Sequence, residues 1–316
     1  MSRHLVFVDG QEGTTGLRIH EMLALRSDIE VLRIDAEKRK DPSERTRLLN
    51  EADVAFLCLP DAASREAATM VANPKTCLID ASTAFRTHPD WVYGLPELSS
   101  IQRVAIKGAK RVSNPGCHAT AFILLVRPLV EAGLIPLDLT LSATSLTGYS
   151  GGGRSMIEEY ESSKNPELLA PRPYALTLTH KHLPEMVRHS GLNSPPIFMP
   201  IVGPFYKGLT VTVSLCLRAS TKKATAESLW AMLSERYTEE VFVRVRPLND
   251  PETLSNGFFN TQRCNDSNRA ELSVFAQGSQ VLLMACIDNL GKGASGAAIQ
   301  NMNLVLGCAE SSGLTL

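Results

Sequence analysis

The sequence lacks the charge excess and the long apolar runs that mark several classes of protein. Its 316 residues carry a formal net charge of -1, so charge gives no general reason to expect binding to nucleic acid or to an anionic membrane. The longest apolar run, residues 119–126, is too short to span a bilayer. With 44% hydrophobic and 21% charged residues, the composition is that of an ordinary soluble globular protein.

Paired cysteine motifs are also missing. The seven cysteines are odd in number and scattered, and none form a C-x-x-C pair. This usage argues against a disulfide framework and against a structural zinc site, so we expect no bound metal. No targeting segment is expected either, because residues 1–4 lead directly into the apolar run at 5–8. We therefore expect a protein of the reducing cytoplasm.

Short strands and helices alternate along the first third of the chain. Apolar runs predict strands at 5–8, 30–34, 54–59 and 77–80, and helical patterns follow at 17–25, 43–50 and 62–71. Alternation of this kind implies βαβ units with right-handed crossovers. This part is therefore predicted to be a Rossmann-like, doubly wound parallel sheet of the α/β class.

The pattern changes from about residue 137. Alternating Thr, Val, Ser and Leu predict a mostly antiparallel sheet with strands at 139–147, 209–218, 241–245 and 272–287, and a helix at 224–237. A last helix at 296–306 is expected to pack back on the first domain. We predict a dinucleotide-binding domain of residues 1–116, completed by 290–316. Residues 117–289 are predicted to form an α+β domain for substrate binding, catalysis and dimerisation.

A glycine-rich turn follows the first predicted strand and opens the first helix. It reads Gly10-Gln-Glu-Gly13-Thr14-Thr15-Gly16. Glycines there allow a tight turn and a close approach of the backbone to a pyrophosphate at the helix N-terminus. The spacing differs from the commoner G-x-G-x-x-G, and a purely structural turn is the alternative. Its position between strand and helix favours dinucleotide binding.

The residues that would select the dinucleotide follow the second strand. Asp35 could bind a ribose diol and favour NAD, whereas Arg33, Lys38 or Arg39 could accept a 2′-phosphate and favour NADP. The charge run at 38–40 could equally be a solvated surface. These residues leave the choice of cofactor open.

Further cofactor contacts are expected beyond the next two strands. Leu59 and Pro60 end the third strand and Ser82 follows the fourth. Ligands of open α/β sheets bind beyond the carboxyl ends of strands, so these turns should border the cofactor.

The stretch Ser113-Asn114-Pro115-Gly116-Cys117-His118 precedes a strongly apolar run that stops at Gly133. Asn or Ser can cap a helix and Pro suits its first turn, so Cys117 is predicted to lie in the first turn of a helix. Unpaired N–H groups and the positive end of the helix macrodipole favour a thiolate there and could hold an oxyanion. The alternative is that Cys117 is a small buried hydrophobe.

A run of three glycines at 151–153 separates the strand ending near Gly148 from Arg154. Such a run indicates either a loop whose backbone approaches a substrate or a flexible hinge. In the first case the guanidinium of Arg154 could bind an anionic group.

Two histidines, His180 and His182, flank a single lysine. They could be metal ligands, but no cysteine or acidic cluster completes a site. A proton-transfer partner for Cys117 is the more economical interpretation. The alternative for either one is an exposed or core histidine. Pro184 and Glu185 mark a helix start directly after them.

A second glycine-rich stretch, residues 288–301, opens the last predicted helix. If that helix returns to the first domain, Asn289 and Gly293 would complete the nucleotide site. Otherwise the small residues only allow close helix packing.

Taken together, these motifs resemble the N-acetyl-gamma-glutamyl-phosphate reductase family of the semialdehyde dehydrogenase group, in its shorter form (type 2). The resemblance covers nearly the whole chain and rests on GQEGTTG at 10–16, CLPD at 58–61, SNPGCHATA at 113–121, GYSGGGR at 148–154, HKHLPE at 180–185 and DNLGKGASGAAIQN at 288–301. His118 departs from the longer form, in which Tyr commonly follows the nucleophile.

The resemblance implies NADPH-dependent reduction of N-acetylglutamyl 5-phosphate to the 5-semialdehyde in arginine biosynthesis, through a thioester on Cys117. His182 is favoured for proton transfer and His180 for substrate binding. Arg86 and Arg154 are expected to bind phosphate or carboxylate. Ser82, Asn114, Gly148 and Glu185 are expected to position substrate or cofactor, and a homodimer or homotetramer is expected.

Other functions compatible with the sequence are a sister enzyme acting on aspartate semialdehyde or carrier-linked 2-aminoadipate semialdehyde, a cysteine acyl hydrolase, and a non-catalytic nucleotide sensor.

Overall fold

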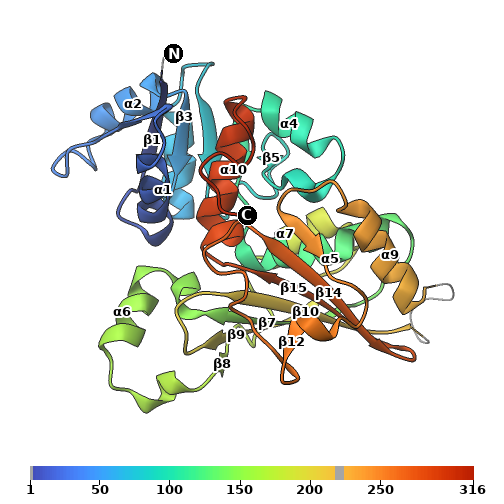
Figure 1. Ribbon diagram of the computed structural model, residues 1–316. Coiled ribbons are helices and arrows are strands. Elements are labelled where there is room, and N and C mark those ends of the chain that lie inside the picture. Colours follow the sequence, from blue (N-terminus) through green and yellow to red (C-terminus); the bar gives the residue numbers. More distant parts are fainter. Residues whose placement is uncertain (1–2, 218–223) are drawn as a thin grey trace. The chain divides into compact units, whose positions relative to one another are not determined.

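The computed structural model describes residues 3–217 and 224–316, and these form two compact units (Figure 1). Unit 1 comprises the chain up to Gly116 together with Ala294–Leu314. Unit 2 comprises Cys117–Gly293 with the last two residues. None of the helices in the described ranges has the length and apolar character needed to cross a membrane.

Unit 1 is built on a six-stranded sheet in which every strand pairs in parallel. The strand order is β2-β1-β3-β4-β6-β5. The strands are β1 (His4–Asp9), β2 (Ile29–Leu32), β3 (Val54–Leu57), β4 (Cys77–Asp80), β5 (Val92–Tyr93) and β6 (Arg111–Ser113). This order and the parallel pairing confirm the predicted Rossmann-like sheet.

Alternating side chains explain why helices cover both faces of this sheet. Val6 and Val8 of β1 belong to one core cluster, with Ile19 and Leu23. Phe7 points the other way, into a cluster with Leu48 and Leu49. The side-chain period of a strand is two, so a strand buried on both faces is apolar at every position.

Four of the helices described in unit 1 begin and end close to the predicted positions, whereas α4 was not predicted. The helices are α1 (Thr14–Ala24), α2 (Pro42–Glu51), α3 (Asp61–Thr69), α4 (Gln102–Gly108) and α10 (Gly296–Val305), with a short 3₁₀ turn at Pro96–Leu98. Asp41 caps α2 by accepting a hydrogen bond from the N–H of Ser43 at 2.8 Å. α10 packs on α4 and β4, and Ile299 and Met302 complete the first core cluster.

Unit 2 contains a seven-stranded sheet of order β11-β14-β15-β10-β7-β9-β8. Its strands are β7 (Ser142–Gly148), β8 (Arg172–Pro173), β9 (Ile197–Gly203), β10 (Leu209–Cys216), β11 (Val243–Val245), β14 (Ala270–Gln277) and β15 (Gln280–Ile287). Four of the six pairings are antiparallel, which confirms the predicted sheet. The single span predicted at 272–287 is a hairpin, and the predicted end of the strand at Arg218 lies outside the described residues.

Helices cover one face of this sheet. α5 (Cys117–Glu131) packs on β10 and β15, α9 (Ala226–Arg236) packs on β14, and α7 (Leu183–Ser190) packs on α5 (Figure 1). Nearly every residue of α5 is buried, which explains its almost unbroken apolar sequence. The remaining elements are α6 (Arg154–Ser162), the hairpin of β12 (Leu254–Ser255) and β13 (Phe258–Phe259), and short turns at Tyr149–Gly152, Pro166–Leu169, Pro251–Thr253 and Gly291–Ser295.

Candidate active site

A cavity of about 480 Å³ opens in unit 1 at the carboxyl ends of β1 and β3. The glycine-rich turn lines it, together with Leu59 and Pro60 after β3. Gly10 has a φ of +89°, and a Cβ there would lie 2.3 Å from the carbonyl oxygen of Cys58. A Cβ on Gly16 would lie 2.4 Å from the carbonyl oxygen of Gly10. Only glycine therefore fits at either position.

The start of α1 suits an anionic ligand. Its N-cap is Gly13, which has no side chain to bond the first N–H groups, and its first turn contains no acidic residue. These N–H groups and the helix macrodipole favour a phosphate group. The turn, the helix start and the cavity together fit the pyrophosphate and adenosine of a dinucleotide.

Cationic side chains lie on the far wall of this cavity. Arg39, Lys40 and Arg45 line it. Arg39 forms an ion pair with Glu12 of the glycine-rich turn. Arg45 donates from Nη2 to Oδ2 of Asp9 at 2.8 Å, and both side chains are buried. Sequence analysis did not single out Arg45, because its partner Asp9 is 36 positions away in the chain.

Four other residues predicted for the cofactor are not in the lining of this cavity. Lys38, like Arg33 and Asp35, is exposed and outside the cavity lining. Thr14 and Thr15 begin α1. Ser82 donates to Oδ2 of Asp80 at 2.7 Å and accepts from the N–H of Ala84, which closes the turn after β4.

Cys117 is the first residue of α5 and is half-buried. The position in a first helical turn agrees with expectation, although Pro115 lies before the helix rather than in its first turn. α5 begins after Pro115, and the side chain of Asn114 donates to the carbonyl of Ala294 at 3.0 Å and accepts from Asn301. The backbone of Asn114 still extends β6 by bonding to Asp80, which turns its side chain toward the start of α10.

Two histidines lie beside the thiol within unit 2. The ligand atoms of Cys117, His118 and His182 all lie within 4.8 Å of one another. The rings of His118, His180 and His182, here called the histidine cluster, have centroids 4.8 to 5.4 Å apart. The structure therefore brings Cys117 close to His182. His180, the other histidine that the sequence singled out, lies in the same cluster.

Hydrogen bonds fix the rings of this cluster. Nδ1 of His118 lies 2.8 Å from Oγ of Ser145, and its Nε2 lies 3.1 Å from the hydroxyl of Tyr174. Nδ1 of His180 accepts from the N–H of His182 at 3.1 Å. Glu185 is buried, with its carboxylate 4.0 Å from Nε2 of His182.

Burial sets the charge state of two histidines and one tyrosine at this site. It lowers the pKa of His118 to about 3. Burial, with a smaller contribution from the charge of Lys181, lowers the pKa of His180 to about 4. Burial also raises the pKa of Tyr174 well above its usual range. Both imidazoles are therefore neutral near pH 7, and the tyrosine hydroxyl keeps its proton.

The remaining predicted residues have local partners. Arg86 donates to the carbonyls of Asn114 and Ala81, each at 3.0 Å. Arg154 is exposed at the start of α6 and donates to Glu158 at 2.7 Å. A Cβ on Gly148 would lie 2.5 Å from the carbonyl of Tyr206, so this glycine allows close packing of the chain.

Asn289 and Gly293 lie in unit 2, and Gly293 packs beside Cys117. Asn289 accepts from the N–H of Gly208 at 2.8 Å and donates to Ser150 at 2.9 Å. A Cβ on Gly293 would lie 2.7 Å from the Cβ of Cys117. The second glycine-rich stretch therefore lets the backbone pass directly beside the thiol.

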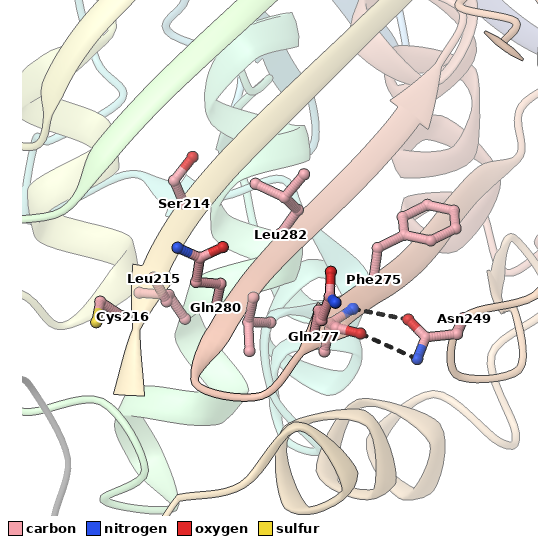
Figure 2. Close-up of a pocket in the computed structure, with 10 residues that line it drawn as sticks. Ser214, Leu215, Cys216, Asn249, Phe275, Gln277, Gln280 and Leu282 are labelled. Carbon is pink, nitrogen blue, oxygen red and sulfur yellow. Dashed lines mark hydrogen bonds between the residues drawn. The ribbon is translucent and has the colours of Figure 1, made fainter. Parts of the chain in front are cut away.

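A second cavity, of about 610 Å³, lies over one end of β10, β14 and β15 in unit 2 (Figure 2). Ser214, Leu282 and Phe275 line it, and the amide of Asn249 exchanges two hydrogen bonds with the backbone of Ala276. Its lining contains none of the residues predicted for catalysis.

Two family models match separate parts of the chain. Residues 6–107 match a family model described as semialdehyde dehydrogenase, NAD binding domain. Residues 117–289 match one described as semialdehyde dehydrogenase, dimerisation domain.

Curated relatives match over nearly the whole chain. An N-acetyl-gamma-glutamyl-phosphate reductase from Burkholderia lata is 45% identical, over 98% of this chain and 98% of its own length. N-acetyl-gamma-glutamyl-phosphate reductase 2 from Nostoc sp. is 44% identical, over 99% of this chain and 100% of its own. The Pseudomonas putida protein of the same name is 45% identical over the same shares.

Solved structures share the fold. Aspartate semialdehyde dehydrogenase II from Vibrio cholerae, complexed with ASA, has a TM-score of 0.73 at 16% identity and covers 97% of this chain and 99% of its own. Aspartate semialdehyde dehydrogenase from Candida albicans, with NADP, has a TM-score of 0.65 at 16% identity, over 96% and 99%. The predicted resemblance is confirmed: the chain belongs to the semialdehyde dehydrogenase family and, within it, to the N-acetyl-gamma-glutamyl-phosphate reductases.

Proposed function

We propose that this chain reduces N-acetyl-L-glutamyl 5-phosphate to N-acetyl-L-glutamate 5-semialdehyde and phosphate with NADPH, a step of arginine biosynthesis. The observation that carries the proposal is Cys117 at the first residue of α5, beside the histidine cluster. Its near full-length relatives at 45% identity are named for this reaction.

The first step is acylation of Cys117. The thiolate, stabilised by the start of α5, attacks the acyl carbon of the acyl phosphate. The tetrahedral oxyanion then collapses, the C–O bond to phosphate breaks, and inorganic phosphate leaves. Amide groups at the same helix end are available to bind the oxyanion.

Reduction of the thioester follows. When bound, NADPH supplies a hydride. The Cys117 thioester accepts it and, with one proton, becomes a thiohemiacetal. The hydroxyl proton then passes to a histidine as the C–S bond breaks, which releases the free aldehyde and restores the thiolate.

We assign the proton transfers to His182 rather than to His180. Nδ1 of His180 accepts a hydrogen bond from the backbone, so neutral His180 carries its proton on Nε2. That nitrogen can donate to a substrate oxygen but cannot act as a base. The buried carboxylate of Glu185, 4.0 Å from His182, would stabilise the imidazolium formed when His182 takes a proton.

NADPH is the proposed cofactor. Arg39 and Lys40 line the cavity of unit 1 and offer positive charge to a 2′-phosphate, whereas Asp35 lies outside its lining. The glycine-rich turn and the start of α1 would hold the pyrophosphate. Arg154, which is exposed, is the proposed partner for the carboxylate of the substrate.

We assign unit 1 to dinucleotide binding and unit 2 to the substrate, to catalysis and to self-association. Cys117 must stay a reduced thiol for this reaction, so we place the enzyme in the cytoplasm.

Steady-state kinetics test the reaction. In the reverse direction, the purified chain should reduce NADP in the presence of N-acetylglutamate semialdehyde and phosphate, with a kcat/KM at least about tenfold above that for NAD. Aspartate semialdehyde should be a far poorer substrate. Preference for aspartate semialdehyde would instead identify a sister enzyme and refute the proposal.

Variants of Cys117 test the covalent step. Cys117→Ala should abolish turnover while leaving the affinity for NADPH nearly unchanged, and Cys117→Ser should retain very little activity because an alcohol is far less ionised. Cys216→Ser, which alters an exposed thiol on β10, is the matched control. Near-normal turnover by Cys117→Ala would exclude a thioester.

A further inference from the structure

We propose that Cys117, His118 and His182 form a binding site for a thiophilic divalent cation, such as Zn²⁺, and that this cation inhibits the enzyme. The proposal rests on the proposed function in one respect, because the cation acts by occupying the nucleophile. Sequence spacing alone argued against metal binding by the two histidines of the HKH motif. The fold supplies the missing sulfur and a third imidazole.

The geometry is close to that of a tetrahedral site. One ligand atom from each residue lies within 4.8 Å of the other two. Bond lengths to Zn²⁺ of about 2.3 Å for sulfur and about 2.0 Å for nitrogen place ligand atoms roughly 3.3 to 3.6 Å apart in a tetrahedron. The most widely separated ligand atoms therefore need to approach one another by up to about 1.5 Å, and the fourth position remains for water or a substrate oxygen.

The donor set matches a borderline-soft cation. Thiolate and imidazole prefer zinc and related transition metals, whereas calcium and magnesium prefer oxygen ligands. One thiolate and two neutral imidazoles reduce the charge of a divalent cation to about +1.

The surroundings would orient the ligands. His118 has a hydroxyl at each ring nitrogen, from Ser145 at 2.8 Å and Tyr174 at 3.1 Å. Coordination through one nitrogen displaces one hydroxyl and leaves the other to hold the ring. The carboxylate of Glu185 lies 4.0 Å from Nε2 of His182, so we expect the cation to bind Nδ1. Carboxylate and hydroxyl partners of this kind fix the tautomer of a metal-bound histidine.

Occupation of the site has a direct chemical consequence. Binding replaces the thiol proton of Cys117 by a metal–sulfur bond, so the sulfur can no longer attack the acyl phosphate. Acylation in turn removes the thiolate and prevents binding of the cation. Inhibition should therefore be reversed by a chelator.

Spectroscopy with cobalt tests the site without any substrate. Co²⁺ added to the full chain under reducing conditions should give a thiolate-to-cobalt charge-transfer band that saturates at one cation per chain. Cys117→Ser should lose this band, and Cys216→Ser should keep it. A band that persists in Cys117→Ser, or no band in the unaltered chain, would overturn the proposal.

Calorimetric titration with Zn²⁺ tests His118 and the carboxylate beside His182. His118→Phe should weaken Zn²⁺ binding at least about 100-fold, and Glu185→Gln should weaken it roughly 10- to 100-fold, as expected for a partner outside the ligand set. Circular dichroism shows whether each variant is folded. Unchanged Zn²⁺ affinity in folded His118→Phe would overturn the assignment of the ligands.

The two proposals can fail separately. If the chain does not reduce the acyl phosphate but shows the cobalt band, the proposed function is wrong and the metal site stands. If the chain is active and saturating Zn²⁺ leaves its turnover unchanged, the inhibitory site is refuted and the proposed function stands.

Discussion

Buried imidazoles dominate the site at the scale of single residues. His118 and His182 are each at most 5% exposed, although histidine is more often found partly exposed. Removal from water disfavours the charged form of a histidine, and the Lys181 charge adds to this effect at His180. His118 and His180 are therefore neutral rings near pH 7, which can accept or donate hydrogen bonds without first losing a proton.

This charge state predicts how stability depends on pH. The pKa of His180 is lowered to about 4 in the folded chain and lies near 6.5 when unfolded, so the unfolded state binds more protons between these values. The free energy of unfolding should therefore fall as pH falls from about 6.5 to about 4. Urea unfolding at pH 7, 6 and 5 measures it.

The variant His180→Asn provides the control for this prediction. It removes one titrating group, so its free energy of unfolding should change less steeply with pH over the same window. An identical slope in the variant would show that other groups cause the dependence.

Sequence reasoning singled out Cys117 and His182 but not the side chains that hold the neighbouring His118 in place. Cys117 follows a turn and precedes an apolar helix, and His182 precedes a proline, so local patterns marked both. Ser145 and Tyr174 are 27 and 56 positions from His118 along the chain, and only the folded sheet brings them together. His118 itself was noted only as a departure from the longer form of the family. A histidine at the start of an apolar helix was nevertheless a usable signal for a buried imidazole.

At the scale of elements, the glycine-rich turn and the segment after β2 form the wall of the dinucleotide cavity. Arg39 reaches back to pair with Glu12, and Arg45 of α2 pairs with Asp9 at the end of β1. Residues 39–45 are thus held against the end of β1 and the glycine-rich turn by two ion pairs. A buried pair such as Arg45 and Asp9 fixes geometry more than it adds stability.

Arg39 predicts the cofactor preference. Arg39→Ala should raise the Kd for NADPH by about tenfold, equivalent to ~1.4 kcal/mol, because a charge-assisted contact to the 2′-phosphate is lost. The Kd for NADH should change little. Fluorescence titration with both dinucleotides measures this, and Lys38→Ala, outside the cavity lining, is the control. Equal losses for NADPH and NADH would place Arg39 away from the 2′-phosphate.

Some strands and helices were predicted from the sequence and others were not, and their residues show why. Strands β1, β3 and β4 are continuous apolar runs and were predicted. β5 and β6 contain two and three residues, too few for a periodic signal. β9 was missed because Pro200 stands in it, and a proline argues against a strand. α6 was missed because none of its residues is buried.

At the scale of the whole molecule, the face of the unit 2 sheet away from α5 and α9 presents apolar side chains between Thr and Ser residues. Cross-strand registers align its side chains in rows, such as Met284, Thr212, Thr144 and Met199 on β15, β10, β7 and β9. The next row contains Leu282 and Ile197, which are 42% and 55% exposed. An apolar surface of this kind on a sheet suits an isologous contact with a second copy of the chain.

Substitution on that face tests the proposed homodimer. Leu282→Glu should convert the dimer to a monomer, because the interface would have to bury two unpaired carboxylates related by symmetry. Multi-angle light scattering measures the molecular mass in solution. Leu25→Glu, at an exposed leucine of unit 1, is the control and should leave the mass unchanged. A dimer that survives Leu282→Glu would place the contact elsewhere.

Unit 1 is discontinuous in the chain, and this has a consequence for biosynthesis. Its core cluster includes Ala298, Ile299 and Met302 of α10, which leave the ribosome only after all of unit 2. The nascent chain therefore carries an unfinished nucleotide-binding core for most of its translation, while unit 2 can already be packed. During that interval the exposed apolar strands of unit 1 are a target for chaperones, and a nonsense mutation even a short way before residue 296 would leave this core without its last helix.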